Sequence, residues 1–119
     1  MPIDNKPYDL EERTFLFAKR IRLNVKSFPK TIANIEDIKQ LVRASGSVGA
    51  NYIEANESLS KKDFLFRVKI SRKEAKESVF WLRLIHETNN FDDDSEVVAL
   101  INEAIELKKI LSAIIVKSK

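Results

Sequence analysis

The sequence predicts an all-α fold: a single domain over residues 1–119, built as an antiparallel up-down-up-down four-helix bundle. A chain of 119 residues has the length of one domain. It contains only 2 Gly and 3 Pro, which is too few for the many turns of a β-sandwich or barrel. Apolar residues recur at helical spacing in four segments, and connections of a few residues favour antiparallel neighbours.

The first predicted helix covers about residues 9–28. Its apolar residues follow the helical period, so that one face can enter a core. The helix is expected to end at Phe28, because Pro29 disfavours helical geometry in the residue before it. This apolar face consists of Leu10, Phe17, Ile21, Val25 and Phe28.

The second predicted helix covers about residues 35–58, with Asn34 as its N-cap and Asp37 in the position of a capping-box acid. Gly46 and Gly49 lie inside it, where each costs about 1 kcal/mol relative to Ala. The apolar face keeps its phase across both glycines, which favours close packing against a neighbour over a break in the helix. This face consists of Ile35, Ile38, Leu41, Val42, Ser45, Val48 and Tyr52.

The third and fourth predicted helices cover about residues 62–89 and 94–117. Ser60 is expected to cap the third helix. The carboxylates of residues 92–94 indicate where the fourth helix begins, because negative charge stabilises the positive N-terminal end of a helix. The apolar face of the third helix consists of Phe64, Val68, Ser71, Ala75, Ser78, Leu82 and Ile85. That of the fourth consists of Val97, Leu100, Ile101, Ala104, Leu107, Ile110, Leu111, Ile114 and Ile115.

The positive charge of the chain is concentrated in the third helix. The net charge is only +3, but residues 61–91 carry 8 Lys or Arg against 4 Asp or Glu. Such stripes bind nucleic-acid phosphates with little sequence preference, although a solvated face that maintains solubility explains the same pattern. The candidate residues for RNA or DNA are Lys62, Lys69, Arg72, Lys76 and Arg83 in the third helix, with Lys19, Arg22 and Lys26 in the first.

A second stripe, polar and small, runs along one face of the second helix. It consists of Gln40, Ala44, Ser47, Asn51, Glu54 and Ser58. Because small side chains let helices approach closely, this stripe predicts a contact with another helix or another subunit. Asn51 and Glu54 are expected to form structural hydrogen bonds there, since polar groups at the edge of a core need partners.

The same helix resembles the signature of a known family, the four-helix-bundle proteins encoded in intervening sequences of 23S ribosomal RNA. Gln40, Arg43, Ser47, Asn51 and Glu54 match the family pattern, and we interpret them as structural or subunit-contact residues. The segment around Trp81-Leu82 is similar to the third helix of that family. Ala55 stands where the family usually has Gly, so that a sharp helix end directly after Glu54 is not expected.

The resemblance implies a four-helix bundle and, in known relatives, a homopentameric ring. A related group of retroelement accessory proteins binds nucleic acid and a reverse transcriptase. Self-association and RNA or DNA are therefore the partners expected for this chain. The alternative is a protein-binding scaffold without nucleic-acid binding, in which the basic stripes are solvent faces or subunit seams.

Catalytic, cofactor and metal chemistry find no support in the sequence. There is no Cys, and the single His86 lies near a helix end, where a cation suits the dipole. Residues 92–94 lack the Gly and the distal Glu of a calcium loop. No nucleotide-binding glycine pattern, transmembrane run or apolar signal-peptide core occurs. We therefore expect a non-enzymatic cytoplasmic protein without cofactor or metal.

Overall fold

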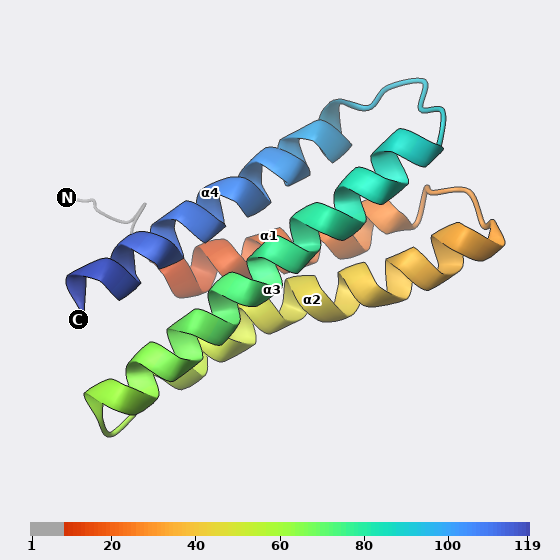
Figure 1. Cartoon of the computed structure of the whole chain (residues 1–119). Coiled ribbons are helices and arrows are strands. Elements are labelled where there is room, and N and C mark those ends of the chain that lie inside the picture. The colour runs from red at the N-terminus through yellow and green to blue at the C-terminus, as the bar shows by residue number, and fades with distance from the viewer. Residues whose placement is uncertain (1–8) are drawn as a thin grey trace.

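The computed structural model describes residues 9–119 and contains, over that range, four helices that alternate in direction (Figure 1). They are α1 (Leu10–Val25), α2 (Ile32–Asn56), α3 (Lys61–Thr88) and α4 (Ser95–Lys117). Each helix packs against the next, and α1 also packs against α4. The predicted up-down-up-down four-helix bundle is confirmed. Residues 1–8, where the sequence shows no signal-peptide core, lie outside the described residues.

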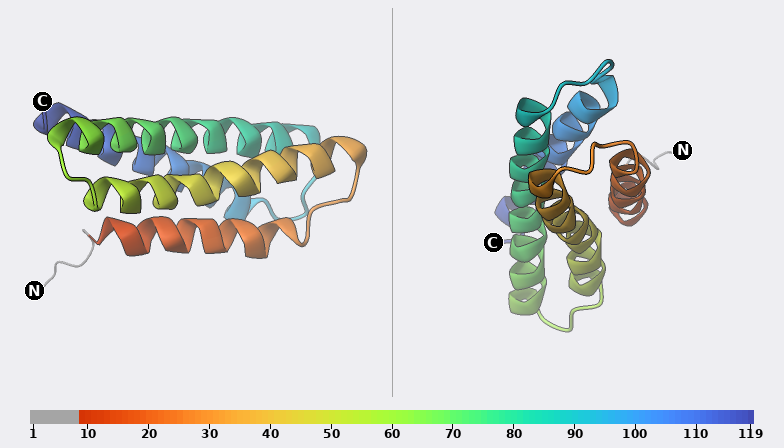
Figure 2. Two further views of the ribbon diagram at one scale, coloured as in Figure 1. Left: turned by 90° about the horizontal axis from the view of Figure 1, so that it is seen from below. Right: turned by 90° about the vertical axis from the view of Figure 1, so that its right-hand side faces the viewer.

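The α2–α3 connection lies at one end of the bundle, and the α1–α2 and α3–α4 connections lie at the other (Figure 2). Asn56, at the end of α2, donates a hydrogen bond of 2.8 Å to Glu11 in the first turn of α1. The end of the bundle with the α2–α3 connection is therefore also the end at which α1 begins. None of the helices within residues 9–119 is long and apolar enough to cross a membrane.

The first helix ends three residues earlier than predicted, at Val25. The backbone N–H groups of Ser27 and Phe28 bond back to the carbonyls of Asn24 and Val25 at 3.1 and 3.2 Å, which closes the chain into turns. Phe28 is nevertheless buried, and its ring meets Phe91 edge-on with centroids 5.6 Å apart. The helical period thus identified a core residue that lies in the turn after the helix.

The prediction that Asn34 caps α2 is wrong, because the helix begins at Ile32 and Thr31 is the N-cap. The Thr31 hydroxyl accepts the N–H of Asn34 at 3.1 Å. The Asn34 side chain is buried and exchanges two hydrogen bonds of 2.9 Å with Asn89, the residue after α3. Asn34 therefore joins two helices.

Capping of the other helices follows the sequence more closely. Ser60 caps α3 as predicted, since its hydroxyl accepts the N–H of Asp63 at 3.1 Å. At the start of α4 only Asp93 is used in this way, accepting the N–H of Ser95 at 2.9 Å. These two hydrogen bonds fix where the helices begin. At the other end of α2, the helix continues past Glu54 to Asn56, two residues short of the predicted end.

The core contains nearly all of the predicted apolar faces, and Ile35 is the clear exception because it is exposed. Close packing between α1 and α2 explains the glycines. A Cβ on Gly49 would lie 2.8 Å from the hydroxyl oxygen of Thr14, a buried residue of α1. A Cβ on Gly46 would lie 3.0 Å from the guanidinium end of Arg22. Gly49 thus permits the contact between the two backbones.

Candidate functional site

The polar stripe of α2 faces α3 within the same chain. Arg43 forms ion pairs with Glu74 at 3.3 Å and with Glu77 at 2.7 Å. Its Nε donates to the side-chain oxygen of Gln40 at 3.3 Å, which orients the guanidinium. Ala44, the next member of the stripe, is fully buried. The small residue Ala44 is therefore used inside the single chain, whereas Glu54 at the end of the stripe is exposed.

Asn51 and Glu54 differ in their contacts. The Asn51 amide donates to the Ser47 carbonyl at 2.9 Å and accepts from Arg67 of α3 at 3.3 Å. Asn51 is thus a hydrogen-bonding residue between two helices. Glu54 is exposed, and its carboxylate makes no hydrogen bond with any residue of the range 9–119. The family motif therefore contains both structural residues and one free surface carboxylate.

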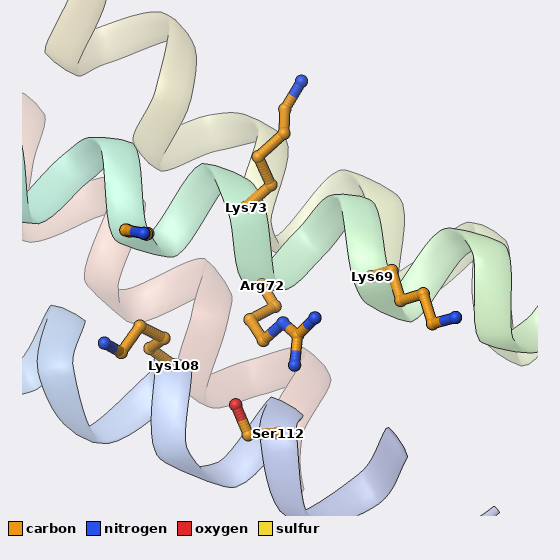
Figure 3. A pocket seen from close by; sticks show the side chains of 6 residues that line it. Lys69, Arg72, Lys73, Lys108 and Ser112 are labelled. Carbon is orange, nitrogen blue, oxygen red and sulfur yellow. The ribbon is translucent and has the colours of Figure 1, made fainter. Parts of the chain in front are cut away.

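A cationic hollow of about 360 Å³ lies between α3 and α4. Figure 3 shows Arg72 extending from α3 toward Ser112 of α4, with Lys108 beside it, whereas Lys73 points away. The residues that line the cationic hollow are Lys69, Arg72, Lys73, Lys76, Lys108 and Ser112. Three of the five predicted α3 cations are thus brought together, and α4 adds a fourth positive side chain that faces the same space.

No carboxylate neutralises the cationic hollow. Within residues 9–119, none of its lysines or its arginine forms an ion pair. The α3 acids that could have done so, Glu74 and Glu77, are held on the other side by Arg43. On α4, Glu106 pairs with Lys109 at 3.7 Å. Like charges at helical i and i+4 spacing repel one another, so this arrangement costs stability and favours an external anion.

Other predicted cations lie elsewhere. Arg83 pairs with Glu87 at 3.2 Å, and Lys62 lies near the start of α3, outside the cationic hollow. The α1 cations border a separate hollow of about 360 Å³, which we call the basic groove. The Arg22 guanidinium there donates to the carbonyls of Ala18 and Val42. The basic groove is lined by Phe15, Ala18, Lys19, Arg22, Leu23 and Lys26.

Sequence reasoning missed Lys73, Lys108 and Ser112. Lys73 follows Lys69 by one helical turn and could have been included from spacing. Lys108 and Ser112 belong to another helix, so that only the packing of α3 against α4 reveals them.

Paired charges elsewhere connect helices. Arg13 of α1 forms two hydrogen bonds with Glu103 of α4, at 2.7 and 2.8 Å, and these bonds raise the pKa of Arg13.

The single histidine is part of the α3–α4 connection. The His86 ring lies 2.9 Å from the Asp94 carboxylate and stacks on Phe91. Over residues 9–119, no group of three or more His, Cys, Asp or Glu side chains is arranged to hold a metal ion. Charged side chains with an open anion-sized space therefore remain the main chemical feature.

The sequence comparison agrees with this four-helix architecture. Residues 7–113 match the family model described as 23S rRNA-intervening sequence protein. The chain belongs to this 23S rRNA-intervening sequence protein family. The family resemblance inferred from the α2 motif and from Trp81-Leu82 is confirmed, and the match covers nearly the whole of the bundle.

A solved structure is similar to this member of the 23S rRNA-intervening sequence protein family. It is a crystal structure of a protein with unknown function from the S23 ribosomal protein family of Bacteroides thetaiotaomicron. The two are 29% identical with a TM-score of 0.77, over 88% of this chain and 96% of that chain. No curated protein matches significantly. The comparisons thus establish family and fold.

Proposed function

We propose that this protein is a non-enzymatic bundle that binds the phosphate backbone of RNA or DNA through the cationic hollow. One observation carries the proposal: Lys69, Arg72, Lys76 and Lys108 line one hollow and have no ion pair among residues 9–119. Arg offers a planar set of donors that suits phosphate oxygens, and Lys supplies point charges. Lys62 extends the positive surface along α3.

Backbone binding is favoured over base recognition. The cationic hollow contains no aromatic side chain on which a base could stack. Its lining supplies cationic groups and one hydroxyl, which are typical phosphate contacts. Binding is therefore expected to depend strongly on salt and weakly on sequence.

Self-association belongs to the same proposal. The family resemblance implies a ring of five subunits, in which five copies of the cationic hollow act on one polyanion. Several identical weak sites on one particle raise the effective concentration of each, which converts weak contacts into avidity. The assembly, rather than the single subunit, is then the nucleic-acid-binding species.

The test is binding of mixed-sequence RNA and DNA at several salt concentrations to the parent protein and to Lys69→Glu with Lys76→Glu. We expect the parent to show a steep negative salt slope. Each lost phosphate contact should flatten that slope by about 0.7–0.9. The double variant should lose binding while its helicity and assembly stay unchanged, because both side chains are exposed.

A matched control is Lys117→Glu with Lys119→Glu, which changes the charge by the same amount at exposed positions outside the cationic hollow. This control should retain binding. Equal loss in both variants would show a general charge effect. If the parent binds neither nucleic acid at low salt, the protein-binding scaffold becomes the better interpretation.

A further inference from the structure

The α2–α3 end of the bundle carries an exposed apolar pair among carboxylates. Leu59 in the connection is 99% exposed and Phe66 on α3 is 58% exposed, and both line the same hollow. Glu54, Glu57 and Asp63 surround them, with Arg67 at the border, in a hollow of about 330 Å³. We call these six residues the acidic tip. It is apolar in the middle and negative at the rim.

The basic groove on α1 has the opposite character. Phe15 is 60% exposed and Leu23 is 56% exposed, and no other helix covers them. Lys19, Arg22 and Lys26 border them, and none of the three forms an ion pair within residues 9–119. This surface is therefore also apolar in the middle, with a positive rim.

We infer that the acidic tip of one copy docks into the basic groove of a second copy. The two surfaces are similar in size, apolar at their centres and opposite in charge, as an apolar interface core with a complementary polar rim requires. A second copy of the chain therefore supplies an occupant for each surface. The inference rests on the proposed self-association and adds the surfaces that form it.

One chain cannot satisfy both surfaces by itself. The acidic tip lies at the end where α1 begins, since Asn56 contacts Glu11 there. The basic groove extends from Phe15 toward the other end of α1, over about 16 Å at 1.5 Å per residue. Contact between two different surfaces is head-to-tail, which produces a closed ring when the rotation between copies closes.

Charge reversal tests the pairing. Glu54→Lys with Glu57→Lys reverses the acidic tip, and Lys19→Glu with Lys26→Glu reverses the basic groove. Each double variant should lower the association constant by roughly a hundredfold, because like charges would then face each other across the interface. Sedimentation and light scattering at tens of micromolar would report a 13.7 kDa species in place of the parent assembly.

The chain carrying all four substitutions is the decisive variant. Its tip is basic and its groove is acidic, so that head-to-tail contact is again attractive and assembly should return. An equimolar mixture of the two double variants should also associate. The control with Lys117→Glu and Lys119→Glu should assemble like the parent. Circular dichroism and thermal melting establish that each variant is folded.

Leu59→Ser provides a test without a change in charge. Because Leu59 is 99% exposed in the single chain, the substitution leaves the fold unaffected. It removes an apolar anchor from the tip and should weaken association about tenfold or more.

A monomeric parent would overturn both the inference and the proposed self-association. A parent that assembles while the reversed variants assemble equally well would overturn only the placement of the interface. A folded four-substitution chain that stays monomeric would overturn the pairing of these two surfaces.

Discussion

Two glycines three residues apart in α2 meet neighbours of very different mobility. Gly49 faces Thr14, which is fully buried and whose hydroxyl donates to the carbonyls of Leu10 and Glu11 at 2.9 and 3.0 Å. Thr14 is therefore held in place. Gly46 faces the end of the exposed Arg22 side chain. The hydrogen bonds of Arg22 to the carbonyls of Ala18 and Val42 lie at the surface, where water can replace them when the side chain moves aside. The same substitution should have opposite effects at the two positions.

Gly46→Ala should raise the free energy of unfolding by up to about 1 kcal/mol, because Ala is the better helix former. Gly49→Ala should lower it by about 1–2 kcal/mol, since the gain in propensity is outweighed by overpacking against Thr14. Urea denaturation of both variants at one protein concentration measures the difference. A Gly49→Ala protein as stable as the parent would mean that α1 can shift away from α2.

At the scale of the element, α4 begins with a carboxylate that holds its first turn. The Asp93 carboxylate accepts hydrogen bonds from the backbone and side chain of Ser95, and these bonds lower the pKa of Asp93 below its ordinary value of 3.8. A pKa that is lower in the folded state stabilises the fold above the unfolded pKa. That contribution is lost as the pH falls through the folded pKa.

Asp93→Asn should therefore melt at a lower temperature than the parent at pH 7. The difference in melting temperature between the two proteins should shrink as the pH falls below the ordinary carboxyl pKa. It should vanish once the pH has passed through the lower pKa of Asp93 in the folded state, because the parent then also carries a neutral side chain. Both proteins contain Asp92 and Asp94, so that the difference between their melting curves isolates Asp93. A gap that persists in acid would assign the effect to side-chain shape.

At the scale of the whole molecule, assembly and nucleic-acid binding are coupled in our proposals. Leu59→Ser leaves the cationic hollow unchanged, since Leu59 lies on the acidic tip at the α2–α3 end and lines none of it. The variant should nevertheless bind RNA and DNA more weakly than the parent, because dissociated subunits lose the avidity of a ring. The measurement is the affinity for RNA and DNA at protein concentrations below and above the concentration at which half of the subunits are assembled. Equal affinity for the parent and the variant would show that each subunit binds independently.

The sequence by itself determined the fold class, the four helices and most of the core. Helical spacing of apolar residues is a local property, and it identified buried residues such as Leu41, Leu82 and Leu107. Local capping also predicted Ser60, whose partner is three residues away. The α2 motif was sufficient to identify the family.

Only the tertiary structure decided how these helices use their polar residues. Asn34 is of a residue type that is common at helix N-caps, yet its side-chain partner Asn89 lies 55 residues away in the sequence. The α3 cations form the cationic hollow together with Lys108 of α4. Arg43 of α2 pairs with Glu74 and Glu77 on the other side of α3, so that these acids do not neutralise the hollow. Periodicity gives the face on which a residue lies, whereas its charge partners depend on which helices are neighbours, and packing fixes those neighbours.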